Sequence, residues 1–318
     1  TGTGYEALHQ NTTGSDNTGV GHSALVSNTT GSRNTAIGKE ALLFNTTGSN
    51  NTASGMYALY NSTTGNSNTA TGYNSLAANT TGTDNTAVGR DALQSNINGH
   101  YNVATGYKAL LNNTTANFNA SYGYKALSSN TTGHDNVANG SSALYSNTTG
   151  SNNVALGSAA LYDLTTGSGN IGIGFRNSSN SYTPVFNPST ESNRLVLGHT
   201  AITNAYVKVS WTVTSDERDK MNFASVPYGL DFVNQLKPTA YQFKVDRDTE
   251  TPDGDVRYGF KAQDILALEG DNPVIIDNED ADHLKYKGEH LVPVLVNAVQ
   301  ELTAMVKELQ TEIETLKG

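Results

Sequence analysis

The sequence predicts a mainly β protein, in which a parallel β-roll or β-solenoid of short repeats precedes an α+β domain ending in a coiled coil. Three observations support this fold class. A 17-residue repeat fills the first half of the chain, every proline lies at or after Pro184, and apolar heptads close the chain. The shift in composition predicts a repeat domain at residues 1–176, a β connector at 177–214 and a terminal domain at 215–318.

The repeat consists of columns of residues that recur every 17 positions without insertion or deletion. An Ala-Leu pair begins at positions 7, 24, 41, 58, 92, 109, 126, 143 and 160, and Ser75-Leu76 keeps the register. A glycine recurs from position 4 to 174 and an asparagine from 17 to 170. A second glycine recurs from position 14 to 167, where Ala116 is the one departure.

Each unit is interpreted as two short strands and two turns, stacked on its neighbours. The glycines and the asparagine supply the positive φ or tightly packed backbone that sharp turns need. The runs 34–37 and 39–43 have strand length and alternate in polarity. A helix would not tolerate so many glycines, because each costs about 1 kcal/mol.

The pattern resembles the head repeats of trimeric autotransporter adhesins of the YadA type, which form a left-handed parallel β-roll in a trimer. The present unit is a few residues longer, and a monomeric β-solenoid is the competing fold. Residues 1–175 offer one small apolar pair and few large side chains per unit, so the predicted core is thin. Units of this kind gain stability by burial against neighbours or other chains, so we expect a homotrimer in which two more copies supply the missing volume.

Composition excludes several classes of function. The net charge is −10 and no basic patch is visible, so we expect no nucleic-acid partner. The chain has no cysteine, which excludes disulfide frameworks and thiolate metal sites. It also shows no membrane span and no signal peptide, so we expect no membrane insertion. Thr1 falls inside a repeat unit, and we expect the chain to be the C-terminal piece of something longer.

Metal, cofactor and glycosidase sites are not expected. The seven histidines are scattered without ligand spacing: His9, His22, His100, His134, His199, His283 and His290. The Asn-Thr-Thr runs match the N-glycosylation acceptor, but a role in the turns explains them sufficiently. Gly172-Ile173-Gly174 belongs to the repeat register and not to a dinucleotide fingerprint, and no pair of acidic residues stands out for glycosidase chemistry.

The remaining elements follow from short local patterns. In the connector, strands are predicted at Arg194–Leu197 and Ala205–Val209, and Ser210–Thr214 leads into the terminal domain. In that domain we predict a helix from Ser225 to Leu236 with Pro227 in its first turn, a strand at 238–245, a turn at Asp253-Gly254, a strand into Phe260, a helix through Leu268, and short strands at 274–276 and 283–286.

The last helix carries an apolar seam spaced alternately by four and three residues, which predicts a coiled coil over 291–317. The seam consists of Leu295, Val299, Leu302, Val306, Leu309, Ile313 and Leu316. An amphipathic helix packed on its own domain is the alternative. The β-branched a positions favour two strands, whereas the resemblance described next implies three.

Ser215 and Lys220 are the candidate catalytic pair. A serine hydroxyl needs a base to become a good nucleophile, and a lysine amine can serve if burial lowers its pKa. On a continuous helix the two side chains would lie roughly 140° apart, so a turn, or pairing across protomers, must bring them together. Taken alone, Ser215–Lys220 is also an ordinary solvated charged turn.

Three motifs in order resemble the C-terminal intramolecular chaperone domains of phage tail fibres and tailspikes, a Ser/Lys self-cleaving peptidase family. Ser215–Lys220 is similar to its SDxRxK signature, Gly259–Asp264 to GFxAQE, and Leu291–Leu302 to LxPxLVxAxQEL. The resemblance implies that Ser215 is the nucleophile and Lys220 the general base. It also implies a single-turnover cut at Thr214-Ser215, with no activity on external substrates.

Together, the repeat and the resemblance predict that the chain is the C-terminal part of a phage tail fibre, a virion protein assembled in the host cytoplasm. We expect its terminal domain to drive trimerisation and then to be released by the cut. The residue after the first glycine varies freely, which suggests an outward face for a host glycan or protein receptor: Tyr5, His22, Lys39, Met56, Tyr73, Arg90, Tyr107, Tyr124, Ser141 and Ser158. The alternatives are an exposed row with no ligand and, for the chain, a bacterial trimeric surface adhesin with a non-cleaving trimerisation domain. A membrane-tethered transcription factor would need a basic DNA-binding domain and a membrane span, which the sequence lacks.

Overall fold

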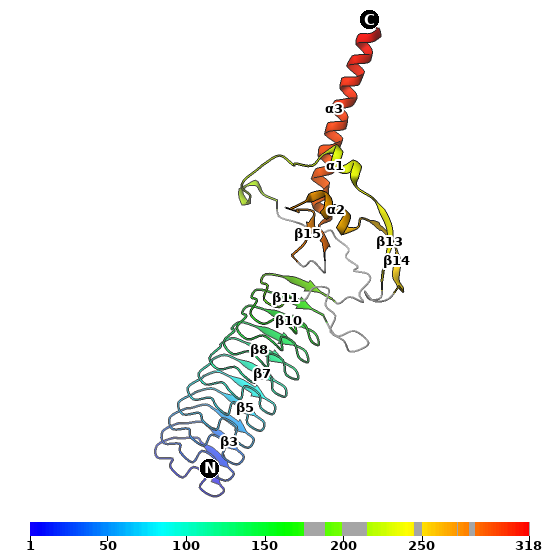
Figure 1. The fold of residues 1–318 in the computed structure, drawn as a ribbon. Coiled ribbons are helices and arrows are strands. Elements are labelled where there is room, and N and C mark those ends of the chain that lie inside the picture. The colour runs from blue at the N-terminus through cyan, green and yellow to red at the C-terminus, as the bar shows by residue number, and fades with distance from the viewer. Residues whose placement is uncertain (175–187, 199–214, 245–249, 272, 280–283, 318) are drawn as a thin grey trace. The chain divides into compact units, whose positions relative to one another are not determined.

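The computed structural model describes residues 1–174, 188–198, 215–244, 250–271, 273–279 and 284–317. It divides the chain into two compact units, which we call unit 1 (Thr1–Ile202) and unit 2 (Thr203–Gly318). Unit 1 is a parallel β-solenoid with a 17-residue repeat, and unit 2 is a small α+β unit with a long terminal helix (Figure 1). The predicted fold class is confirmed at this level.

One strand per turn of chain builds a single parallel sheet of twelve strands in unit 1. From β1 to β11, neighbouring strands pair one repeat apart, as Thr35 does with Thr52 and Ala36 with Ala53. The strands are β1 (Gly2–Thr3), β2 (Thr18–Val20), β3 (Thr35–Ile37), β4 (Thr52–Ser54), β5 (Thr69–Thr71), β6 (Thr86–Val88), β7 (Val103–Thr105), β8 (Ala120–Tyr122), β9 (Val137–Asn139), β10 (Val154–Leu156), β11 (Ile171–Ile173) and β12 (Leu195–Leu197).

The prediction of a second strand in each unit is wrong. The run 39–43 forms turns in which Glu40 and Leu42 have positive φ values of 57° and 51°. A strand would point Ala41 and Leu42 to opposite faces, whereas the left-handed turns bury both side chains completely. The Glu40 amide donates to the His22 carbonyl of the preceding coil at 2.8 Å, and the Leu42 amide donates to the Ala58 carbonyl of the following coil at 3.0 Å. The coil therefore satisfies its backbone without a second sheet.

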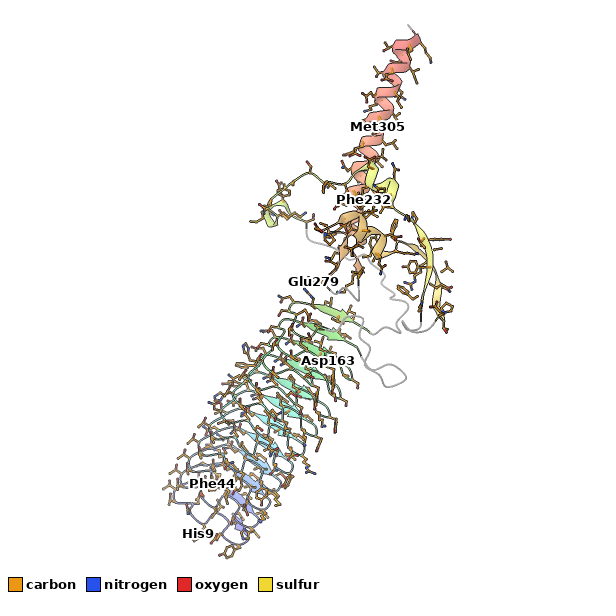
Figure 2. The ribbon with its side chains drawn as sticks, in the orientation of Figure 1. His9, Phe44, Asp163, Phe232, Glu279 and Met305 are labelled. Atoms are coloured by element: carbon orange, nitrogen blue, oxygen red, sulfur yellow. The ribbon has the colours of Figure 1, made fainter. Side chains whose placement is uncertain are left out.

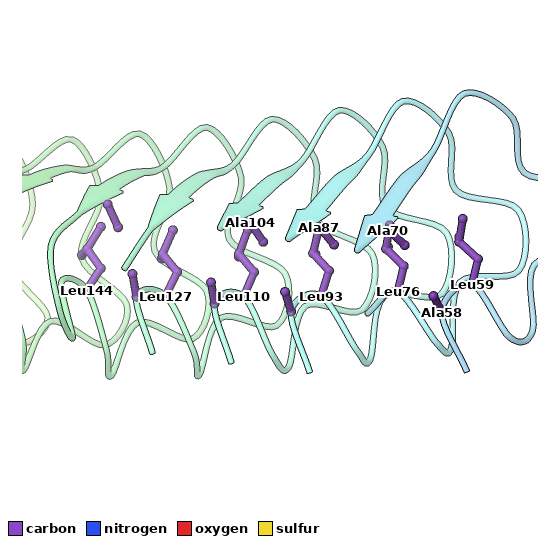
Figure 3. Close-up of a cluster of buried hydrophobic side chains, with 14 of the residues drawn as sticks. Ala58, Leu59, Ala70, Leu76, Ala87, Leu93, Ala104, Leu110, Leu127 and Leu144 are labelled. Carbon is purple, nitrogen blue, oxygen red and sulfur yellow. The ribbon is translucent and has the colours of Figure 1, made fainter. Parts of the chain in front are cut away.

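The core of unit 1 is a stack of identical layers, each built from a few aliphatic side chains (Figure 3). Ala87, Ala92 and Leu93 are fully buried, and the same positions are buried in neighbouring coils. One chain thus closes this core by itself. The expectation that two further copies must supply missing core volume is wrong, because small side chains suffice where the coil is this narrow.

Glycine is required where successive coils approach most closely. Gly38 has a φ of 131°, and a Cβ atom at this position would lie 2.7 Å from the carbonyl carbon of Gly55 in the next coil. Both the backbone conformation and the space exclude a side chain. The predicted role of this glycine column is confirmed.

Two ladders of buried asparagine side chains run the length of unit 1. In one, the Asn51 amide group donates to the Gly65 carbonyl at 2.8 Å while its Oδ1 accepts the backbone N–H of Asn68 at 2.9 Å. In the other, which belongs to the Asn-Thr-Thr runs, Asn45 Nδ2 donates to Asn28 Oδ1 at 2.7 Å. These Asn-Thr-Thr asparagines are buried, so the turn role and not glycosylation explains them.

The second ladder is interrupted where the repeat departs from asparagine. Ser62 stands one repeat after Asn45, at the equivalent position of the next coil. Both Asn45 Oδ1 and Ser62 Oγ are buried without a partner. Leu164 stands one repeat after Asn147 and leaves Asn147 Oδ1 unpartnered in the same way. Each departure therefore leaves an unpaired acceptor in the preceding coil.

The solenoid continues beyond the last regular repeat. β12 pairs in parallel with β11, with Ile171 opposite Leu195, so this turn spans 24 residues instead of 17. The strand predicted at Arg194–Leu197 is confirmed as β12, and it extends the sheet into the range predicted as a connector. The strand predicted at Ala205–Val209 lies outside the described residues.

Among its described residues, unit 2 contains two antiparallel strand pairs, two short α-helices, one long α-helix and two 3-10 helices. A small core joins Phe232 and Ile265 to Ile276 and to Leu291. The elements are the 3-10 helix η1 (Glu217–Asp219), α1 (Leu230–Gln235), β13 (Thr239–Lys244), β14 (Pro252–Gly259), α2 (Ala262–Glu269), β15 (Ile276–Asp277), β16 (Lys285–Tyr286), the 3-10 helix η2 (Gly288–His290) and α3 (Leu291–Lys317).

Two local predictions in unit 2 are wrong. α1 begins at Leu230 and not near Pro227, because the Glu301 carboxylate of α3 accepts the Leu230 amide at 2.7 Å and so fixes the first turn. The expected turn at Asp253-Gly254 lies within β14, where the register with β13 shifts between Tyr241 and Phe243. The irregularity accommodates Gly254, whose φ is 74°.

The first part of α3 packs on the core of unit 2, and the rest is exposed. Leu291, Val294 and Ala298 are buried, whereas Met305 stands on the exposed part (Figure 2). All seven seam residues are exposed, from 41% for Leu295 to 87% for Leu316. The helix is confirmed over its predicted range, and its seam is bare in one chain. Among the described residues, no helix combines the length and the apolar run that crossing a bilayer requires.

Candidate functional site: the Ser215–Lys220 turn

The segment 215–220 is built around one turn of 3-10 helix. Asp216 is the N-cap of η1, with its carboxylate accepting the Arg218 amide at 2.9 Å. Lys220 is the C-cap, and its amide donates to the Glu217 carbonyl at 3.1 Å. Both caps have extended backbone, so the chain enters and leaves the turn without forming a longer helix.

This turn brings the predicted pair together. Lys220 Nζ donates a hydrogen bond to Ser215 Oγ at 2.6 Å within one chain. Helix geometry predicts that a continuous helix would separate the Ser215 and Lys220 side chains and that a turn is needed to join them. The short 3-10 helix is such a turn, because it ends before Lys220 and allows the side chain to fold back towards Ser215.

Asp216 and Arg218 form a second pair beside the first. The guanidinium donates to the carboxylate through Nε at 3.0 Å and through Nη2 at 2.6 Å. The Arg218 side chain, followed by its backbone amide, lowers the pKa of Asp216, and the same pair raises the pKa of Arg218. Asp216 therefore stays ionised at lower pH than an isolated aspartate, and it holds η1 in place through its cap.

The candidate pair is open to solvent in one chain, since Ser215 and Lys220 are both exposed. A lysine acts as a base only when its amine is neutral, and burial is the usual means of favouring that state. A single chain therefore supplies the contact between the two side chains but not a shielded site. Thr214, the other side of the predicted cleavage point, lies outside the described residues.

Two acidic residues of unit 2, Glu269 and Glu301, have structural roles that the sequence analysis did not predict. Glu269 is almost fully buried and its carboxylate accepts the amides of Val274, Ile275 and Ile276 at 2.7–2.9 Å. Glu301, within the third motif, caps α1 as described above, and neighbouring Asn297 donates to the Tyr228 carbonyl at 2.9 Å. A glutamate at the end of a helix, followed by glycine and an apolar strand, is the signal that points to Glu269.

No group of three or more His, Asp or Glu side chains that could hold a metal ion occurs among the described residues. His134 contacts Asp135 at 2.6 Å as an isolated exposed pair, and His100 Nδ1 lies 3.0 Å from Thr83 Oγ1. His199 and His283 lie outside the described residues.

The row of residues after the first glycine of each repeat is a surface ladder on unit 1. Tyr73 and Tyr124 are 41% and 51% exposed. Arg90 lies over Tyr73 and Tyr107, with its guanidinium carbon 5.6 Å and 6.0 Å from the ring centroids, and Tyr107 stacks on Tyr124 at 5.4 Å. From Tyr73 to Tyr124 the ladder therefore holds one cationic side chain, Arg90, between aromatic rings of adjacent coils.

Comparison with known proteins identifies the segment that contains the candidate pair. Residues 215–272 match the family described as the chaperone of endosialidase, a self-cleaving intramolecular chaperone. The match runs from Ser215 through α2 and does not include the solenoid. No curated protein and no solved structure matches the chain. The terminal unit is therefore similar to the C-terminal intramolecular chaperone domain of phage tail fibres and tailspikes, and the match supports a chaperone role in a phage tail protein.

Proposed function

We propose that this chain is the C-terminal part of a phage tail fibre whose unit 2 assembles a homotrimer and then releases itself by cutting Thr214-Ser215. The observation that carries the proposal is the contact of Lys220 Nζ with Ser215 Oγ at 2.6 Å, inside the segment that matches the self-cleaving family. Trimerisation is a property of that family, and the bare apolar seam of α3 supports association of like helices.

The proposed reaction is intramolecular. Neutral Lys220 takes the proton of the Ser215 hydroxyl, and Oγ attacks the carbonyl carbon of Thr214. The Thr214–Ser215 C–N bond breaks, Lys220 returns the proton to the leaving amine, and an ester to Ser215 Oγ remains. Water then hydrolyses this ester to a Thr214 carboxylate and a free Ser215 hydroxyl. Since the reacting groups belong to one chain, proximity replaces substrate binding and one turnover suffices.

The exposure of the pair links cleavage to assembly in this proposal. One chain leaves both side chains in water. Surfaces contributed by neighbouring copies would shield Lys220 and favour its neutral form. Cleavage then follows assembly, and loss of the chaperone leaves the fibre kinetically trapped.

Host recognition is proposed for the aromatic and cationic ladder of unit 1. Tyrosine supplies large contact area with a polar edge, and the ladder is exposed along consecutive coils. A glycan or protein on the host surface is the proposed ligand, and the virion is the proposed location.

Denaturing gels test the cut. Wild type is expected to give two fragments, 1–214 and 215–318, whereas Ser215→Ala and Lys220→Ala each leave one full-length band and still form trimers. Ser225→Ala and Lys237→Ala remove an exposed serine and an exposed lysine elsewhere in unit 2 and are expected to cleave normally. A folded wild-type trimer that stays whole after prolonged incubation would show that unit 2 is a chaperone without protease activity.

A further inference from the structure

The outer face of the solenoid sheet changes character along its length. In every three-residue strand the middle residue is buried, so the first and third residues face outwards. In β4 and β5 these outer positions hold only Thr and Ser. In β10, β11 and β12 they are all aliphatic, and we call these six residues the sheet patch: Val154, Leu156, Ile171, Ile173, Leu195 and Leu197.

The sheet patch is bare in one chain. Leu156 is 37% exposed, Ile173 46%, Leu195 56% and Leu197 47%. Because the three strands are hydrogen-bonded neighbours in register, the six side chains form one contiguous aliphatic surface. A contiguous exposed aliphatic surface of this kind marks a contact with another macromolecule.

Further copies of this chain are the partner that the molecule itself indicates. The seam of α3 repeats its apolar spacing over seven exposed residues, a pattern that like helices cover. β12 ends at Leu197 and unit 2 begins at Thr203, so chains joined through α3 hold their β10–β12 coils at high effective concentration. The aliphatic coils are the ones nearest to unit 2 along the chain, whereas the Thr- and Ser-bearing β4 and β5 lie many coils earlier.

We infer that the sheet patch is a contact between copies of the chain, through which the shafts join first at their C-terminal coils. The inference rests on the proposed homotrimer and adds the surface by which the solenoids meet. It also accounts for six aliphatic side chains in positions where β4 and β5 carry only Thr and Ser.

Cysteine cross-linking tests the contact directly, since the chain contains no cysteine of its own. Leu156→Cys, Ile173→Cys and Leu197→Cys are each made in the full chain and oxidised with copper phenanthroline. Disulfide-linked dimers are expected on non-reducing denaturing gels. Thr149→Cys, exposed in the coil of β10 but off the sheet face, and Thr71→Cys, on the same face in β5, are the matched controls and are expected to link far less.

Sedimentation of the same samples separates this inference from the proposed function. A trimer that links at the patch and not at the controls supports both. A trimer whose patch cysteines never link overturns the sheet contact and leaves the assembly role intact, and this includes the case in which unit 2 of the same chain covers the patch. A chain that sediments as a monomer at every concentration overturns both.

A variant without cysteine tests the same contact in case the cysteine substitutions disturb the sheet. Leu156→Thr/Ile173→Thr/Leu197→Thr introduces the residue that β5 and β7 carry at the same position, so the coil is expected to fold. Its trimer is expected to dissociate at lower temperature than wild type. The same three-residue change at Val20, Ile37 and Val88 is expected to leave dissociation unchanged, and equal effects of the two sets would contradict the inference.

Discussion

Unit 1 and unit 2 bury their apolar side chains in opposite ways. In unit 1 the Leu93 and Ala92 positions are fully covered by the coils on either side, and backbone and asparagine side chains bond one repeat away. In unit 2 the α3 seam and the Ser215–Lys220 pair are left exposed. The core of the coils is therefore complete within one chain, whereas the terminal unit leaves its helical seam uncovered. Under the proposed function, the coils fold within unit 1 and the assembly of chains begins at unit 2.

Removing unit 2 should have the largest effect. A chain synthesised without residues 215–318 is expected to yield aggregated or monomeric repeats. Stacked coils depend on non-local contacts, which form slowly and can pair in the wrong register. Size-exclusion chromatography and sedimentation report the outcome. Soluble trimers of the expected mass from the deleted chain would end the chaperone role.

Paired leucine substitutions sharpen the comparison. Leu93→Ala opens a cavity in a closed core and is expected to destabilise the chain by about 2–5 kcal/mol at any protein concentration. Leu302→Ala removes a seam residue that is 49% exposed, so its effect should appear only in the association of chains. Denaturant unfolding followed at several concentrations distinguishes the two. A concentration-independent loss at Leu302 would place the seam in a contact within the chain.

Restoring the asparagine ladder should stabilise unit 1. In Ser62→Asn, the new amide group is positioned to donate to the unpartnered Asn45 Oδ1, and its own Oδ1 can accept from Asn79 Nδ2. Satisfying a buried acceptor in this way is expected to raise the free energy of unfolding by about 1 kcal/mol. Thermal unfolding measures the gain, and Ser62→Ala is the control that removes the hydroxyl without rebuilding the ladder. A loss of stability in Ser62→Asn would mean that the coil has no room for the amide.

The smallest effect concerns the turn next to the candidate pair. Arg218 lowers the pKa of Asp216, so this carboxylate keeps its charge to a lower pH than an isolated aspartate would. Arg218→Ala removes that influence, and the pKa of Asp216 should rise towards its ordinary value. An NMR titration of the Asp216 carboxyl in both proteins reads the shift. Because both side chains are exposed, global stability should change little, and a large change would contradict a merely local role.

The strict repeat made the solenoid predictable from the sequence. The elements that were missed depend on contacts with residues distant in the sequence, which local patterns do not show. The glycine column, the Ala-Leu core and β12 were found from the sequence. The second strand at 39–43 was not, because left-handed φ at Glu40 and Leu42 is imposed by hydrogen bonds to adjacent coils. The start of α1 was missed for a similar reason, since the group that caps it, Glu301, lies 71 residues away in the chain.

The candidate site shows the same limit at shorter range. Residue types suggested the Ser215–Lys220 pair, and helical geometry argued that a turn was needed. The 3-10 turn itself depends on the Asp216 carboxylate, which caps it. The residue types of the hexapeptide alone do not predict this cap. The catalytic roles of the two side chains and the trimer remain predictions.

The strict spacing of unit 1 makes shaft length a countable quantity. Each coil bonds to the next one repeat away, so an insertion or deletion in the middle of the stack preserves every contact only if it contains whole multiples of 17 residues. Each added repeat would lengthen the shaft by one strand spacing, about 4.8 Å. The turn between β11 and β12, which spans 24 residues, shows that other lengths are accommodated at the end of the stack. Gain or loss of whole repeats would therefore change the length of unit 1 in fixed increments, while the terminal unit stays the same.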